Sequence, residues 1–128
     1  MEVSRTLKID DKIIFGRDKL WLIEMRQTEN EFYVKVEFDI EEETIQRKLA
    51  FKNTVFCASI ELDTFEKSTI SSSWLESKSN FEEVENSKLL SEKYISIRSD
   101  YKAEDFKHYR ISTYDNIIEI ISEDYKVI

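Results

Sequence analysis

The chain has 128 residues, a net charge of −8 at pH 7, and a composition that is 41% hydrophobic and 12% aromatic. This length suits one domain with a buried core, residues 1–128, and no apolar run approaches the roughly 18 residues of a membrane span. One glycine and no proline exclude the glycine-rich loops that hold phosphates, and a single cysteine excludes an intramolecular disulfide and a thiol-rich metal site.

The first half of the chain predicts β-strands. Residues 13–15 and 19–25 are apolar segments on either side of Gly16, which indicates two strands joined by a turn. The clearest signal lies at residues 31–40, where apolar side chains alternate with charged residues or a tyrosine. Such alternation is typical of an antiparallel strand that has one face on a core and one in water.

Two more strands are predicted downstream. Residues 44–51 alternate again, and residues 54–62 are apolar on both faces at their centre, as in an interior strand. Cys57 lies in this last segment, so we expect it to be buried and unreactive. Together the segments predict an antiparallel meander of about five strands.

The densest charge in the sequence falls within and just after residues 31–40. Closely spaced carboxylates can hold a divalent cation, but their order is not that of a calcium loop and no glycine bends the chain there. We therefore expect no metal or cofactor, and two roles stay open: a solvated hairpin tip, or a docking patch for a basic protein surface. The predicted partner-binding residues are Glu37, Asp39, Glu41, Glu42, Glu43 and, from the next segment, Trp74.

A polar, serine-rich connection is predicted at residues 63–80. It carries Trp74, which either packs at the edge of the core or stands out as an interface anchor. The connection is too short to be a linker between two domains, so the chain is expected to fold as one unit.

A helix is predicted at about residues 87–98. Asn80 and Glu83 have the spacing of a capping box, and Ser87 is a second candidate N-cap. The expected buried face of this helix consists of Leu90, Tyr94 and Ile97. Two isoleucines in the same stretch also alternate as in a strand, so helix and strand both remain open there.

The last quarter of the chain predicts a hairpin and a short closing strand. Residues 109–113 alternate, and Asp115 with Asn116 forms a turn-type pair. Residues 117–121 then run back as an interior strand, and residues 125–128 close the edge. The whole pattern predicts a single α+β domain, mainly an antiparallel sheet with one packed helix.

His108 is the only histidine. On the predicted register it shares a polar strand face with Arg110 and Ser112, so we expect it to lie exposed at the edge of the hairpin. Asp105 and Glu104 are near enough in sequence to orient its ring if the segment turns helically. A hydrolytic site also needs a nucleophile and oxyanion donors, and a metal site needs three or more ligands. We therefore expect a surface hydrogen-bonding role and no enzymatic activity.

The charge is spread over both halves of the chain. No basic patch neutralises phosphates, so we expect no binding to nucleic acid. An acidic surface keeps a protein in solution, and it also complements a basic partner. The first residues lack the apolar core of a secretory signal, which favours a cytoplasmic protein without a membrane anchor.

Several segments together resemble a known group of proteins. They are residues 51–55, 84–87, 108–109 and 115–121. In this order they resemble small, mostly uncharacterised bacterial proteins, some of which are similar to immunity proteins of polymorphic-toxin systems. The resemblance implies a cytoplasmic, non-enzymatic protein that neutralises its cognate toxin by binding it, and it carries over no catalytic residue.

Two functions are therefore expected from the sequence. The first is an immunity-like protein whose acidic face occludes a basic toxin, with a nuclease among the candidate toxins. The alternative is a small-molecule or metabolite-binding domain, with its ligand held between sheet and helix near Trp74 and Tyr94.

Overall fold

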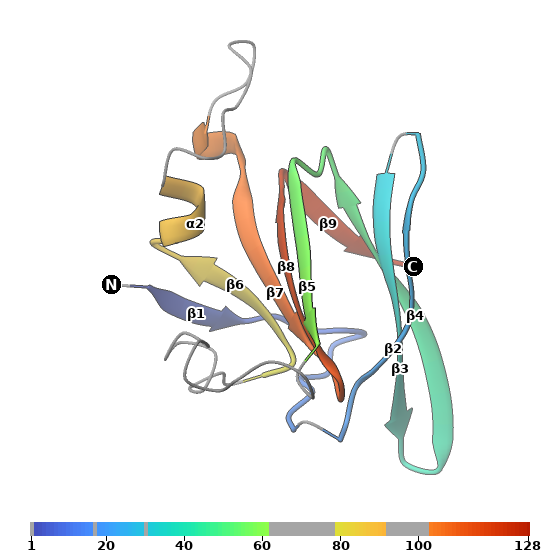
Figure 1. Ribbon diagram of the computed structural model, residues 1–128. Helices are drawn as coiled ribbons and strands as arrows, with labels where there is room; N and C mark the ends of the chain where they lie inside the picture. Colours follow the sequence, from blue (N-terminus) through green and yellow to red (C-terminus); the bar gives the residue numbers. More distant parts are fainter. Residues whose placement is uncertain (1, 17, 30, 62–78, 92–102) are drawn as a thin grey trace.

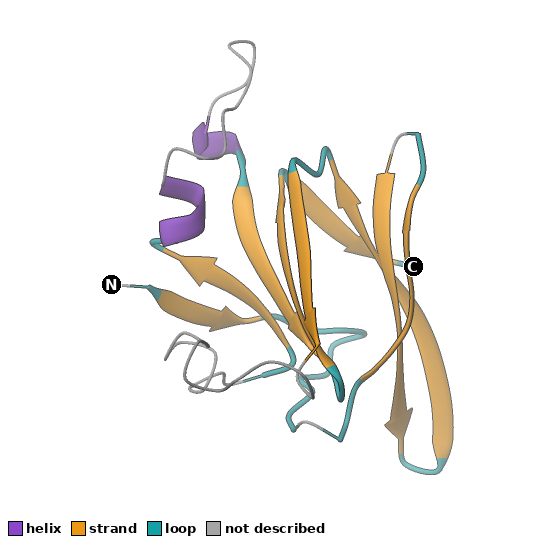
Figure 2. Ribbon diagram, viewed as in Figure 1, coloured by secondary structure: helices purple, strands orange, loops and turns teal. Residues whose placement is uncertain are grey.

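Two antiparallel sheets make up most of the computed structural model, which describes residues 2–16, 18–29, 31–61, 79–91 and 103–128 (Figure 2). Within these residues the five-stranded sheet consists, in spatial order, of β1 (Val3–Thr6), β6 (Phe81–Glu85), β7 (Lys107–Ser112), β8 (Asn116–Ser122) and β5 (Phe56–Glu61). The four-stranded sheet consists of β2 (Trp21–Gln27), β3 (Glu31–Ile40), β4 (Glu43–Lys52) and β9 (Asp124–Val127). The sheets face each other across the core (Figure 1).

The core fills the space between the two sheets. From the four-stranded sheet it takes Phe32, Val34, Val36, Phe38, Leu49 and Phe51, and from the other sheet Phe81, Tyr109, Ile111, Ile118 and Ile120. Aromatic rings bridge the layers: the centroids of Phe51 and Tyr109 lie 5.5 Å apart, and those of Phe81 and Tyr125 lie 4.9 Å apart. Because every second residue of β3 is apolar, the strand presents one continuous face to this core, as its alternation predicts.

The predicted meander of about five strands is confirmed for β2, β3 and β4 and is wrong for residues 13–15 and 54–62. β2, β3 and β4 are neighbours, and β3 pairs with β4 without a break from Glu31 opposite Lys52 to Ile40 opposite Glu43. β5 instead crosses to the other sheet and pairs with β8, while β9 takes the place beside β4. Alternation shows which side chains share a face, but it does not show which strands pair.

Two short segments also differ from the prediction. Residues 13–15 form no strand, and β1 lies nearer the N-terminus, paired with β6 so that Val3 faces Glu85. This partner is far away in sequence, so nothing local in residues 3–6 indicates it. Cys57 is exposed rather than buried, because β5 is an edge strand.

The helical content is smaller than an α+β fold implies. The only α-helix in the described part is α2 (Lys88–Ser91), accompanied by the 3₁₀ turn η2 (Ala103–Asp105), so the described fold is mainly β. The helix begins where Ser87 predicts it, whereas Asn80 is not an N-cap and instead precedes β6. Residues 92–98 of the predicted helix, with Tyr94 and Ile97, lie outside the described residues.

No helix among the described residues has both the length and the apolar character needed to cross a membrane.

Candidate functional site

His108 is buried, with 3% of its surface exposed, so the predicted exposed edge is wrong. Its strand face was predicted correctly, because Tyr109 and Ile111 point into the core and His108 and Arg110 point to the opposite side of β7. That opposite side is itself covered, since Arg110 is also buried there. Strand periodicity separates the two faces but does not say whether the second face meets water.

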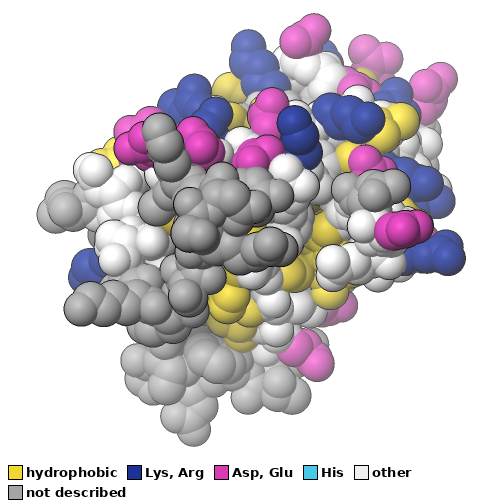
Figure 3. All heavy atoms as spheres, turned by 90° about the horizontal axis from the view of Figure 1, so that it is seen from above, with side chains coloured by type: hydrophobic (Ala, Val, Ile, Leu, Met, Phe, Trp, Pro, Cys, Tyr) yellow, Lys and Arg dark blue, Asp and Glu magenta, His cyan; other side chains and the backbone are white. Residues whose placement is uncertain are grey.

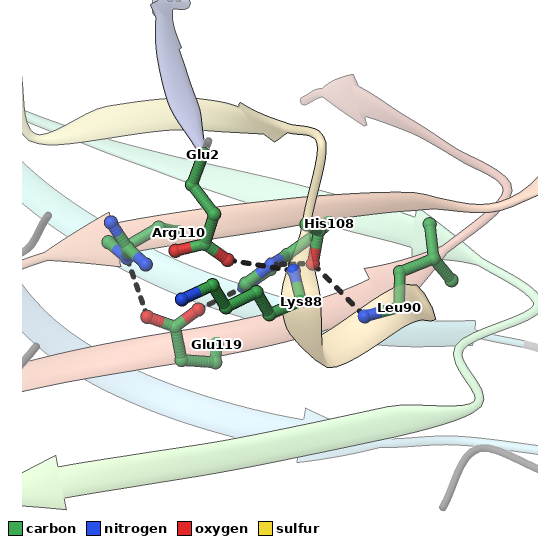
Figure 4. Close-up of polar contacts among 7 residues, drawn as sticks. Glu2, Lys88, Leu90, His108, Arg110 and Glu119 are labelled. Atoms are coloured by element: carbon green, nitrogen blue, oxygen red, sulfur yellow. Dashed lines mark hydrogen bonds and ion pairs between the residues drawn. The ribbon is translucent and has the colours of Figure 1, made fainter. Parts of the chain in front are cut away.

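A buried network of charged and polar side chains occupies this second face (Figure 4). Arg110 on β7 lies directly opposite Glu119 on β8, and its Nε donates a 2.6 Å hydrogen bond to Glu119 Oε1. The other carboxylate oxygen of Glu119 pairs with His108 Nε2. Buried charges are tolerated only when they are paired and hydrogen-bonded. Glu119 on β8 therefore links His108 and Arg110, which both lie on β7.

Ser87 connects this unit to the start of α2. Its Oγ lies 2.7 Å from His108 Nδ1 and accepts a 3.0 Å hydrogen bond from the backbone N–H of Leu90. A side-chain oxygen bonded to the third helical N–H is an N-cap, so this prediction is confirmed. The Glu2 carboxylate accepts a 2.9 Å bond from the Lys88 N–H, so the first turn of α2 is held from two sides (Figure 4).

A hollow of about 720 Å³ opens beside the network, between α2 and the ends of β6 and β7. Its walls include the carboxylates of Glu83, Glu85 and Glu104, together with the apolar Leu90 and Phe106. Ser87 and His108 contribute to its inner wall. The volume lies within the usual range for small-molecule sites.

The order serine, histidine, carboxylate is that of a hydrolytic triad, but the contacts of Ser87 differ from those of a nucleophile. Ser87 is 6% exposed, and its oxygen already accepts the N–H of Leu90. A nucleophile needs a lone pair directed at substrate and nearby donors for the oxyanion. The contacts of Ser87 instead explain a structural role, in which His108 and Glu119 fasten α2 to the sheet.

The sequence contains one signal for this network. Glu119 interrupts a run of four isoleucines in a strand that is buried on both faces. A carboxylate in such a strand implies a buried partner.

Five of the six predicted partner-binding residues come together at the β3–β4 hairpin. Glu37 and Asp39 lie on β3, Glu41 and Glu42 form the turn, and Glu43 begins β4. The sixth, Trp74, lies outside the described residues. The turn requires a positive φ of 59° at Glu41, so the tip has a fixed backbone shape.

The carboxylates of the hairpin tip form no ion pair with the residues that the structure describes. Asp39 accepts a hydrogen bond from Thr44, and Glu37 accepts one from Gln46. Glu41, Glu42 and Glu43 are exposed, and they form no ion pair or side-chain hydrogen bond with any residue that the structure describes.

The opposite end of the molecule carries a different charge pattern. The hairpin tip is at the bottom of Figure 1, and Figure 3 shows the molecule from above. There, Lys and Arg side chains are interspersed with Asp and Glu side chains. The one-signed charge is therefore a property of the hairpin end and does not cover every surface.

A second hollow, of about 390 Å³, lies against the hairpin. Residues 12–15 and Lys19 line one side, and the end of β3, from Phe38 to Ile40, lines the other. The site therefore combines an acidic tip with an adjacent apolar depression.

Neither metal nor thiol chemistry is evident among the residues described. No group of three or more His, Cys, Asp or Glu side chains is placed to hold a metal ion within them. Cys57 is exposed, but desolvation by its neighbours raises the pKa of its thiol to about 11. The thiol is thus protonated at neutral pH and is a poor nucleophile.

Comparison with protein-family models, curated proteins and solved structures gives no match to this chain.

Proposed function

We propose that this protein is a non-enzymatic, immunity-like binding protein that neutralises a basic cognate toxin by direct contact in the cytoplasm. The observation that carries the proposal is the β3–β4 hairpin, where exposed carboxylates gather without basic partners among the described residues. An unpaired, one-signed tip attracts a surface of opposite charge and speeds its approach. The resemblance of the sequence to immunity proteins of polymorphic-toxin systems supports the same function.

The polar side chains around His108 are buried, which favours a binding role for the protein. The one histidine hydrogen-bonds to Ser87 and Glu119, so its described contacts serve the fold. The exposed carboxylates of the hairpin make few contacts within the described residues, so they are available to a partner. A nuclease is a suitable toxin, because a protein surface that binds nucleic acid is itself basic.

The test starts from the neighbouring reading frame. A toxin-like product encoded beside the gene is purified and mixed with this protein, and complex formation and residual toxin activity are measured. We expect a stable complex and loss of toxin activity in proportion to the added protein. A toxin that stays active at saturating concentrations of this protein contradicts the proposal.

A second function is favoured by the hollow between α2 and the sheet. Of the three carboxylates on its walls, Glu83 and Glu85 pair with Arg5. Glu104 is therefore the one that favours a cationic metabolite such as an amine, which Phe106 and Leu90 would contact through apolar groups. This keeps the ligand between sheet and helix as the sequence suggests, although Trp74 and Tyr94 lie outside the described residues.

A thermal-shift screen with amine metabolites separates the two functions. A ligand at 100 times its dissociation constant stabilises the folded protein by about 2.7 kcal/mol. Leu90→Arg, which places a positive charge in the hollow, is expected to abolish such a shift. If no amine stabilises the protein, the second function is wrong and the first is unaffected.

A further inference from the structure

Two large apolar side chains stand exposed beside the acidic hairpin. Phe15 is 56% exposed and Ile13 is 44% exposed, and both line the hollow of about 390 Å³ against the end of β3. Single exposed apolar residues are common on protein surfaces. Here two of them share one depression, which is the usual form of an anchor site at an interface.

Hydrogen bonds from Asn80 hold the loop that carries Ile13 and Phe15. Buried Asn80 donates from its side-chain Nδ2 to the carbonyl oxygens of Gly16, at 2.9 Å, and Ser112, at 2.7 Å. Its backbone N–H donates to the carbonyl oxygen of Ile14, at 2.8 Å. The loop is therefore hydrogen-bonded to Asn80, the residue before β6, and Asn80 in turn bonds to the end of β7.

The single glycine serves the same loop. Gly16 has a φ of 109°, a conformation that other residues rarely adopt, and a Cβ at this position would come within 3.2 Å of the Lys19 side chain. Glycine thus permits the turn that exposes Phe15, and Asn80 fixes it. A surface that is ordered before binding loses less entropy when a partner arrives.

Charge defines the kind of partner that fits. Segments 10–19 and 37–43, which supply the hollow and the hairpin, contain eight acidic residues against three basic ones. Lys12 and Lys19 line the hollow itself and Asp10 pairs with Arg47, so the acidic surplus lies at the hairpin tip, at Glu41, Glu42 and Glu43. A second copy of this chain would bring like charges together, and nucleic acid would be repelled for the same reason. A polypeptide with an apolar side chain between lysines or arginines complements the depression and the acidic hairpin tip beside it.

We propose that the hollow lined by Ile13, Phe15 and Ile40 is the anchor pocket of the binding surface, and that it takes an apolar side chain of a basic partner segment. This inference rests on the proposed function and assigns separate roles in binding to the hairpin tip and the hollow. The glutamates at the tip accelerate association, and the hollow sets how long the complex lasts.

The test uses three synthetic peptides of equal length. The first has one leucine flanked by lysines, the second replaces the leucine with serine, and the third replaces the lysines with glutamates. Binding to the full chain is measured by fluorescence anisotropy and by NMR shifts of the loop amides. We expect the first peptide to bind about tenfold more tightly than the second, which corresponds to 1.4 kcal/mol, and the third not to bind.

Two protein variants locate the effect. Phe15→Ala is expected to weaken the first peptide about tenfold, while the matched control Val55→Ala, which truncates another exposed residue at 45% exposure, leaves binding unchanged. Because both side chains are exposed, both variants are expected to fold normally, as circular dichroism will show.

The inference is overturned if leucine and serine peptides bind alike, if Phe15→Ala binds as the wild type does, or if no peptide binds. Each of these results leaves the proposed function standing, because that function is tested separately with the whole toxin-like protein. Failure of the whole protein to bind removes the function itself.

Discussion

The second face of the five-stranded sheet and the β3–β4 hairpin use the same kind of residue in opposite ways. On the sheet, the Glu119 carboxylate is 5% exposed and contacts both Arg110 and His108. At the hairpin, Glu41 and Glu42 are exposed and make no ion pair with a described residue. The first carboxylate is committed to the fold, and the others are available to a partner.

The difference shows how charge separates stability from recognition in this chain. A buried ion pair is not a strong source of stability, but removing one partner leaves the other charge in a place that water cannot reach. An exposed carboxylate contributes little to stability, since water already solvates it. Substitutions in the network should therefore lower the free energy of unfolding, and substitutions at the tip should change only binding.

The largest expected effect comes from Glu119→Ala. It removes a hydrogen-bond partner from buried Arg110 and from buried His108, so we expect a loss of about 3–5 kcal/mol in the free energy of unfolding. Urea unfolding measures the loss. The matched control Glu42→Ala at the hairpin is expected to stay within about 0.5 kcal/mol of the wild type. Similar losses of unfolding free energy in the two variants would contradict the proposed difference between the buried network and the hairpin.

His108→Ala is expected to cost about 1–3 kcal/mol, because the truncated ring leaves Glu119 and the Ser87 hydroxyl short of a partner. An exposed histidine would instead cost under about 1 kcal/mol. Ile120→Ala, in the core between the sheets, is the reference for a packing defect at about 2–5 kcal/mol. A negligible effect of His108→Ala, measured in the same urea series, would mean that the network does not hold the fold.

Tyr109 sharpens the comparison at alkaline pH. Burial, with smaller effects from Asp124 and Glu83, raises the pKa of Tyr109 above its ordinary value of 10.0. Above about pH 10 the unfolded chain therefore loses this proton first, and the free energy of unfolding falls as the pH rises. Tyr109→Phe should make that fall shallower by up to about 1.4 kcal/mol per pH unit. Urea unfolding between pH 8 and 11 tests this, and an unchanged slope contradicts it.

The smallest stability effect is expected for Ser87→Ala, at about 1 kcal/mol, since it removes the N-cap of α2 and the hydrogen bond to His108. The control is Ser91→Ala at the other end of the helix, whose hydroxyl bonds only the Lys88 carbonyl among described residues. Thermal unfolding compares the two variants. Equal melting temperatures would mean that the Ser87 hydroxyl adds no stability to the fold.

The sequence predicts the features that depend on near neighbours. The alternation at residues 31–40 identifies β3 and its core face, and Ser87 marks the start of α2, because strand periodicity and helix capping are local. The acidic tip is also predictable in this way, since its residues lie within seven positions of one another. Five of its predicted contributors come from a single hairpin.

The features that were missed depend on distant partners. β1 pairs with β6, and the place of β5 beside β8 is decided by strands at the other end of the chain. The burial of His108 follows from what covers the second face of the sheet, which no local pattern states. Residues 13–15 predict a strand, but Phe15 stands exposed on a loop whose Ile14 and Gly16 carbonyls accept hydrogen bonds from Asn80.

The most direct test of the account is the association rate of the toxin-like partner with the triple variant Glu41→Lys, Glu42→Lys, Glu43→Lys, measured by stopped-flow at low and high salt. The account predicts that the variant binds at least about tenfold more slowly at low salt, that its rate depends much less on salt, and that its free energy of unfolding is nearly unchanged. An association rate equal to that of the wild type at every salt concentration would contradict the account and remove the hairpin from the interface.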